Sequence, residues 1–233
     1  MPDFNLQTVA VVKSCYKQKF GIPRQSGLST SSEAVIELSA PYNHEDYVRE
    51  LGGFSHLWII FIFHQHLDKE VKPTVRPPRL GGNKRIGVFA SRSSFRPNPV
   101  GLSVVKLNKI CTDNGKVSLH VSGADLLDGT PVIDIKPYVK YADSVTDSFS
   151  SYAETQPENT LTIEFSDQSL SIIEKYLDKY PELKSIITET LSLDPRPAYQ
   201  NDNDREYGLT LFNFNIKWVV KDTVASVILI EKL

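Results

Sequence analysis

Four polar loops of this sequence combine glycine and proline with arginine or aspartate, and each loop interrupts apolar, strand-like segments. Rigid loops of this kind hold backbone groups close to a ligand at little entropic cost, and arginine offers a planar fork for a carboxylate or a phosphate. One such loop is well explained by turn chemistry alone, but several in one half of the chain predict a ligand site. The loops span residues 21–28, 76–83, 91–102 and 125–131.

Three histidines suggest a second chemistry. His56, His64 and His66 are separated by even numbers of residues, so they lie on one face if residues 54–66 form a single strand. A His-x-His pair with a third histidine upstream is a metal-ligand pattern, which makes a metal-dependent hydrolase an alternative function. The competing interpretation is hydrogen bonding at a strand end, because no cysteine or carboxylate accompanies these histidines, and we predict no metal.

The charge is distributed unevenly along the chain. Residues 71–112 contain no Asp or Glu, although the chain has 28 acidic residues in all and a net charge of −2. A positive surface on an otherwise acidic molecule suits an anionic partner such as a nucleic acid, although ion pairing within the fold is the alternative. The basic residues of this segment are Lys72, Arg76, Arg79, Lys84, Arg85, Arg92, Arg96, Lys106 and Lys109.

The segments that flank these loops have mostly strand patterns. Strand patterns occur at residues 6–16, 34–40, 54–63, 86–90, 100–110, 117–121 and 132–135, with a single short helix beginning near Asn43 and ending at Gly52. No glycine-rich turn of the G-x-G-x-x-G type joins a strand to a helix, so we do not expect a doubly wound dinucleotide-binding or methyl-donor domain. We therefore predict a mainly β protein with a small antiparallel or mixed β-barrel.

The last third of the chain has a different pattern. A polar segment precedes helical stripes at residues 170–177 and 183–191 and strand patterns at residues 207–219 and 224–230. This predicts a β-barrel domain over residues 1–145, a linker over 146–160 and a small α+β domain over 161–233.

Composition favours a soluble, cytoplasmic protein. Hydrophobic residues make up 40% of the chain, and the longest apolar run, Leu57 to Phe63, is too short to cross a membrane. No secretory signal is expected after Met1, and the two separated cysteines, Cys15 and Cys111, fit a reducing compartment.

Five blocks together carry a family resemblance. The segments GIPRQSGL, GFSHLWIIFIFH, RPPRLGGNKRIGVFASRSSFRPNPVGLSVVKL, DLLDGTPVIDIKPY and DPRPAY resemble, in this order, those of the TsaA-like family, also called YaeB or TrmO. The resemblance implies an S-adenosylmethionine-dependent methyltransferase that acts on N6-threonylcarbamoyladenosine at tRNA position 37, beside the anticodon. It also implies a homodimer and a β-barrel catalytic domain. A non-catalytic RNA-binding module is a further alternative.

The resemblance also implies a methyl-donor pocket and an RNA surface. His64 is the expected general base because its ordinary pKa suits neutral pH, the alternative being a hydrogen-bonding wall of the pocket. Arg196 and Tyr199 are expected to meet the modified base, the alternative being a packed turn between domains. Arg76, Arg79, Lys84, Arg85 and Arg96 are expected to follow the phosphates of the anticodon loop. The expected donor-binding residues are Pro23, Arg24, Gln25, Phe63, His64, Gln65, Arg92, Leu102, Asp125, Leu126, Leu127, Asp128 and Gly129.

Overall fold

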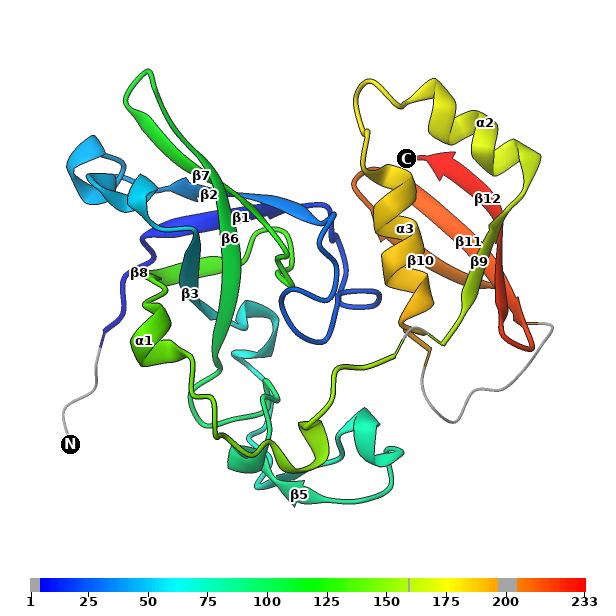
Figure 1. Ribbon diagram of the computed structural model, residues 1–233, viewed down its shortest axis with the longest axis horizontal. Coiled ribbons are helices and arrows are strands. Elements are labelled where there is room, and N and C mark those ends of the chain that lie inside the picture. Colours follow the sequence, from blue (N-terminus) through cyan, green and yellow to red (C-terminus); the bar gives the residue numbers. More distant parts are fainter. Residues whose placement is uncertain (1–4, 159, 197–204) are drawn as a thin grey trace.

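The computed structural model describes residues 5–158, 160–196 and 205–233 and contains two units (Figure 1). The first unit is a closed barrel of antiparallel strands, which confirms the predicted mainly β fold. Around the barrel the strands are β1 (Ala10–Ser14), β2 (Glu33–Leu38), β7 (Lys116–Ser122), β6 (Val100–Asp113), β3 (His56–Ile62) and β8 (Pro131–Pro137).

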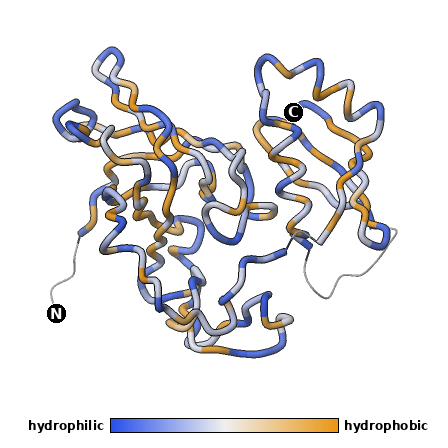
Figure 2. Tube along the Cα trace, viewed as in Figure 1, coloured by the Kyte–Doolittle hydropathy of each residue, from blue (hydrophilic) through white to orange (hydrophobic). Residues whose placement is uncertain are grey.

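Burial alternates along the barrel strands, although β3 itself is apolar on both faces. In β3, the buried residues Leu57, Ile59 and Phe61 alternate with partly exposed neighbours, as expected when one face of a strand lines the core. Val12 of β1 and Leu119 of β7 are fully buried in the same cluster. Hydrophobic residues lie along the strands in Figure 2, whereas the tip of the β6–β7 hairpin is hydrophilic.

A long excursion between β3 and β6 carries most of the basic loops. It contains η3 (His64–His66), the two-stranded sheet of β4 (Thr74–Val75) and β5 (Ile86–Gly87), η4 (Pro78–Leu80) and η5 (Val88–Ala90). The strand predicted over residues 86–90 is wrong beyond Gly87, because the chain turns into a 3-10 helix there. The excursion therefore presents loops beside the barrel instead of adding a strand to it.

The short helix predicted from Asn43 to Gly52 is also wrong in detail. The segment forms two 3-10 turns, η1 (Glu45–Val48) and η2 (Leu51–Gly53). Glu50 between them has a φ of 63°, which an α-helix does not accommodate. His44, and not Asn43, caps the first turn by accepting from the Asp46 amide.

The second unit is a small α+β structure. Its sheet has the order β10 (Tyr207–Leu211), β11 (Phe214–Lys221), β12 (Val224–Lys232) and β9 (Thr162–Phe165), with β9 parallel to β12. Helices α2 (Asp167–Lys175) and α3 (Leu183–Ser192) pack beside this sheet (Figure 1). The single strand predicted over residues 207–219 is wrong, since the chain turns at Phe212, whose φ is 53°, and returns as β11.

The two units are connected by the chain itself and by packing of residues from the barrel unit into the second core. The chain leaves the barrel through α1 (Lys140–Asp143), and residues 144–158, with η6 (Ser151–Ala153), lead to the second unit. In addition, Cys15 and Tyr16, directly after β1, are buried in the hydrophobic core of the second unit. Among the described residues, no helix is long and apolar enough to span a membrane.

Candidate active site

A cavity of about 440 Å³ opens beside the barrel where β3 ends and β6 begins. Its volume lies in the range of small-molecule sites. The structure brings together ten of the thirteen residues predicted to bind the methyl donor. They are Pro23, Arg24, Gln25, Phe63, His64, Gln65, Arg92, Leu102, Asp125 and Leu127.

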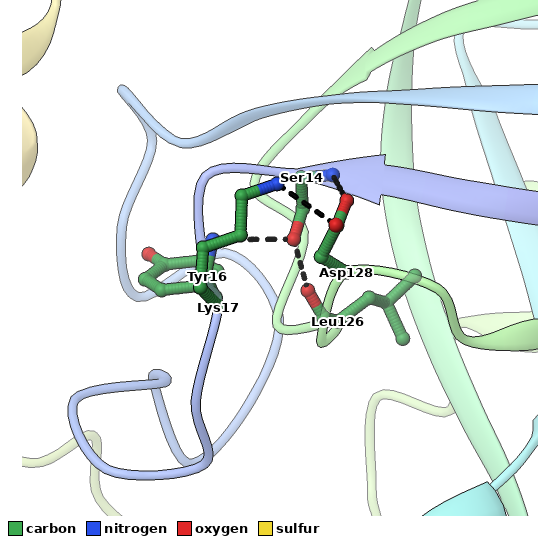
Figure 3. Close-up of polar contacts among 5 residues, drawn as sticks. All are labelled: Ser14, Tyr16, Lys17, Leu126 and Asp128. Atoms are coloured by element: carbon green, nitrogen blue, oxygen red, sulfur yellow. Dashed lines mark hydrogen bonds and ion pairs between the residues drawn. The ribbon is translucent and has the colours of Figure 1, made fainter. Parts of the chain in front are cut away.

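The other three predicted residues do not line this cavity. Leu126 is buried in the barrel core, and Gly129 lies in an exposed turn with a φ of 77°. The Asp128 carboxylate accepts from the Ser14 amide at 3.0 Å and pairs with Lys17 Nζ at 2.8 Å (Figure 3). Asp128 thus ties the loop after β7 to the end of β1, and its part in donor binding stays a prediction.

Asp125 is the carboxylate of the cavity wall. Ser103 Oγ, on β6, donates to Asp125 Oδ1 at 2.6 Å. Burial raises the pKa of this carboxyl above its ordinary value, while the Ser103 hydrogen bond and the nearby Arg92 oppose the rise. A carboxylate in the wall of such a cavity is suited to accept from hydroxyl or ammonium groups of a ligand.

The arginines of the cavity come from two different loops. Arg92 Nη1 donates to Gln25 Oε1 at 2.6 Å, which joins the loop at residues 21–28 to the loop at residues 91–102. Gln25 Nε2 in turn donates to the Arg24 carbonyl at 2.6 Å. Within the described residues, neither Arg24 nor Arg92 forms an ion pair, so both remain available to a ligand carboxylate or phosphate.

His64 and His66 line the cavity beside a lysine. His66 Nε2 lies 3.0 Å from Lys19 Nζ. Burial and the charge of Lys19 lower the pKa of both histidines below the usual value. A lowered pKa keeps the His64 imidazole neutral near pH 7, in the form that accepts a proton.

The histidine arrangement differs from the single strand over residues 54–66 that the metal-site alternative requires. β3 ends at Ile62, and His64 and His66 lie in a 3-10 turn. His56 is at the opposite end of β3, where it contacts Ser55 and the Tyr138 ring. In the described parts of the chain, no three His, Cys, Asp or Glu side chains gather as metal ligands, which removes the geometric basis of the hydrolase alternative.

The predicted RNA-binding residues are divided between the excursion and the cavity lining. Arg76, Arg79, Lys84 and Arg85 are exposed on the excursion, whereas Arg96 lines the cavity. The guanidinium of Arg79 donates to the Thr155 carbonyl. None of these residues forms an ion pair with any described acidic residue.

Arg196 is held away from the cavity lining. Its Nε and Nη2 donate to the Asp194 carboxylate at 2.8 and 2.9 Å, and its guanidinium lies over the Tyr207 ring. The Asp194 hydrogen bond and charge raise the Arg196 pKa above its ordinary value. Tyr199 lies outside the described residues, so its predicted role and that of Arg196 stay predictions.

Several cavity residues were not predicted as donor-binding. Ser103 is the most informative, because a serine between the buried positions Gly101 and Val105 interrupts an apolar face of β6 and signals a polar partner inside. Most of the others lie in the loops predicted to form a ligand site but were not singled out, whereas Lys19 and Phe61 lie outside those loops and are brought to the cavity by the fold. These other residues include Lys19, Ile22, Phe61, Ser91, Ser94, Gly101 and Thr130.

Comparison with known proteins gives one consistent family. The model of the tRNA-methyltransferase O N-terminal domain matches residues 11–144, and that of the TrmO C-terminal domain matches residues 158–233. The chain is 45% identical to the tRNA (adenine(37)-N6)-methyltransferase of Escherichia coli K12 over 236 residues, covering 99% of both chains. It is 39% identical over 216 residues to a Pseudomonas aeruginosa PAO1 protein, RcsF, named provisionally as an S-adenosylmethionine-dependent methyltransferase; the match covers 92% of this chain and 91% of that protein.

A solved structure shows the same architecture. The crystal structure of TrmO from Pseudomonas aeruginosa superposes with a TM-score of 0.84 at 31% identity, covering 99% of each chain. The resemblance inferred from the five sequence blocks is thereby confirmed. The chain belongs to the tRNA-methyltransferase O (TrmO) family.

Proposed function

We propose that this chain transfers a methyl group from S-adenosylmethionine to the exocyclic N6 nitrogen of N6-threonylcarbamoyladenosine at tRNA position 37. The observation that carries the proposal is a ligand-sized cavity bordered by an unpaired basic surface, in a chain whose relatives are tRNA (adenine(37)-N6)-methyltransferases. The threonylcarbamoyl group is the part of the proposal that the family resemblance supplies.

The cavity chemistry fits the methyl donor. Asp125 can accept from the ribose hydroxyls or the amino group, and Arg24 or Arg92 can hold the donor's carboxylate. Phe63 and Leu102 offer apolar surface to the purine, and Leu102 is 48% exposed without a ligand, which leaves its side chain free for such a contact. When bound, S-adenosylmethionine supplies an activated methyl group on a sulfonium centre.

The remaining chemistry is a proton transfer. The acceptor nitrogen is urea-like and has little free lone-pair density, so its attack is helped when a base removes its proton. His64 lines the cavity and is neutral near pH 7, so its free ring nitrogen can take that proton. A base with a lowered pKa gains a proton less readily than free imidazole, so orientation of the acceptor carries a large share of the acceleration.

The surface beside the cavity suits a folded RNA. The Phe89 ring on η5 is 77% exposed, and the Arg96 guanidinium lies 5.9 Å from its centroid. An exposed aromatic ring next to an arginine is a platform for an unstacked base, and the free basic residues attract phosphates. This combination supports an anticodon loop as the partner. The cytoplasmic location and the homodimer stay predictions.

Methyl transfer to defined tRNA tests the proposal. The chain is incubated, in EDTA, with S-adenosylmethionine labelled in its methyl group and with tRNA that either has or lacks the threonylcarbamoyl group. The proposal predicts labelling of the modified tRNA alone. Labelling of neither tRNA, with tRNA still bound, would favour a non-catalytic RNA-binding module, and an activity that EDTA abolishes and zinc restores would favour the metal-dependent alternative.

A further inference from the structure

We infer that Glu189, on α3 of the second unit, is a positioning residue that holds one wall of the methyl-donor cavity in the barrel. The inference rests on the proposed function and deepens it. It assigns to the C-terminal unit a part in donor binding that is separate from any contact with RNA.

The Glu189 carboxylate accepts hydrogen bonds from one short turn of the barrel unit, residues 29–31. Ser29 Oγ and the Ser31 amide donate to Oε2 at 2.6 and 3.1 Å. Ser31 Oγ and Thr30 Oγ1 donate to Oε1 at 2.9 and 3.3 Å. Hydrogen bonds to an ionised group are individually stronger than neutral ones, so this carboxylate fixes the position of the turn.

The segment that leads to this turn from β1 is also anchored on the second unit, at residues 15–21. Phe20 stacks on Trp218 of β11 with ring centroids 5.9 Å apart, and the Phe212 amide donates to the Cys15 carbonyl at 2.7 Å. Gly21 has a φ of 87°, and a Cβ added there would meet Thr190, the neighbour of Glu189, at 3.4 Å. The chain is thus seated on α3 and the second sheet immediately before the donor loop begins.

The residues between the two anchors form the cavity wall. Pro23, Arg24 and Gln25 line the cavity, and Gln25 carries the Arg92 hydrogen bond across it. Gly27 is held by the Gly123 carbonyl at 2.9 Å, but its amide is the one backbone donor within residues 23–28 for which the structure shows a long-range backbone partner. This contact, the Gln25–Arg92 hydrogen bond and a hydrogen bond from the Ser26 backbone to Asp125 hold the middle of the wall, whereas Glu189 holds its end. Releasing the Glu189 end adds disorder that a ligand must remove on binding.

Donor affinity and local amide exchange of the full chain test the inference. Glu189→Ala should weaken S-adenosylmethionine binding by about tenfold, measured by calorimetry well below the unfolding temperature, because the loop must be ordered on binding. In the donor-free protein, the Ser31 amide should exchange faster, while amides of β6 stay protected. Glu182→Ala, at the exposed start of the same helix, is the matched control and should leave both readouts unchanged.

Two further variants separate positioning from folding. Glu189→Gln keeps the shape and one acceptor oxygen, so it should recover part of the donor affinity. Ser29→Ala with Ser31→Ala should reproduce the Glu189→Ala loss, and combining all three should add little because both changes break the same contacts.

The outcomes distinguish this inference from the proposed function. A wild-type chain that fails to bind S-adenosylmethionine overturns both. A wild-type chain that binds it, together with a Glu189→Ala variant that binds equally well, overturns the inference alone. The inference is also overturned if the Glu182→Ala control loses as much affinity, or if Glu189→Gln and Glu189→Ala both unfold while the serine variants bind normally.

Discussion

The cavity wall and the basic excursion lie next to each other, yet they are held in opposite ways. In the cavity wall, Asp125 is bonded to Ser103 and Arg92 to Gln25, and outside the lining Asp128 ties the loop after β7 to β1. On the excursion, Arg76, Lys84 and Arg85 are exposed, and no described acid pairs with them. The cavity is arranged before a ligand arrives, whereas the excursion keeps its charges unneutralised.

This difference matches two kinds of ligand. A small molecule with several polar groups binds best when the site is ordered in advance, because less conformational entropy is lost on binding. A polyanion is attracted over distance by free cations, which do not need one fixed geometry. The predictions below test whether the two regions can be impaired separately.

The largest effect on donor affinity is expected for a substitution at Gly101, where the cavity wall leaves no space for a side chain. A Cβ at Gly101 would overlap the Phe61 ring, so Gly101→Val must push that ring or the backbone of β6 aside. We expect a loss of roughly 1–3 kcal/mol in the free energy of unfolding and a loss of donor affinity of at least about 100-fold. Calorimetric titration and chemical denaturation measure the two.

The matched control is Gly208→Val in β10, where an added Cβ would meet its nearest neighbour at 3.7 Å. Donor binding by Gly208→Val should be normal. Normal donor binding by Gly101→Val would show that the cavity is not the donor site.

Asp125→Asn should separate donor binding from stability. The folded-state pKa of Asp125 is raised, so the stability due to its protonated form is present at low pH and is lost as pH rises through the folded pKa. At pH 7 the ionised carboxylate therefore lowers the free energy of unfolding. Asp125→Asn removes this charge, so it should raise the free energy of unfolding. It should also weaken donor binding by about tenfold, because a charged acceptor is lost.

Chemical denaturation between pH 4 and 7 checks this sign. The stability difference from the wild type should shrink toward pH 4, whereas Asp178→Asn, at an exposed position, should show no such trend. A less stable Asp125→Asn at pH 7 with unchanged donor affinity would mean that Asp125 is purely structural.

The basic excursion should respond to salt. Arg79→Glu with Arg85→Glu should weaken tRNA binding most at low salt, and the slope of log affinity against log salt should fall by about 1–2 as phosphate contacts are lost. Donor affinity should stay unchanged. Lys175→Glu with Lys179→Glu, on and just after α2, makes the same charge change in the second unit; equal losses for both pairs would point to net charge and not to this surface.

The smallest effect on the donor is expected for Asp128→Ala. Its carboxylate binds Ser14 and Lys17 outside the cavity lining, so removing it should lower the free energy of unfolding by about 1–2 kcal/mol. The geometry favours this structural role over the direct donor contact predicted from the sequence, so donor affinity, measured by the same titration, should change by less than about threefold because the cavity-lining groups remain. A tenfold loss would place Asp128 in direct contact with the donor.

Local strand patterns predicted the barrel well. The strands β2, β3 and β7 were predicted near their observed positions, although the apolar run of β3 does not show which of its faces is buried. Errors arose where the chain changes direction within a predicted strand, as at Gly87 and Phe212. The short strand β9 was missed because its stability comes from parallel pairing with β12, a contact that the local pattern does not encode.

The site was predictable in parts. Loop composition and the family blocks indicated the donor loops, but neither separates Asp125, which lines the cavity, from Asp128, which is bonded to Ser14. Both aspartates occur in the same loop, and only the tertiary fold decides where each points. The same holds for Lys19 beside His66 and for Glu189 beside Ser29, whose partners lie 47 and 160 residues apart in the chain.

A crystal structure of the chain with S-adenosylmethionine tests the central claim most directly. The account predicts density for the donor in the barrel cavity, in contact with Phe63, Arg92 and Asp125, next to His64. Density for the donor elsewhere, or a saturated crystal with this cavity closed by its own side chains, would contradict it.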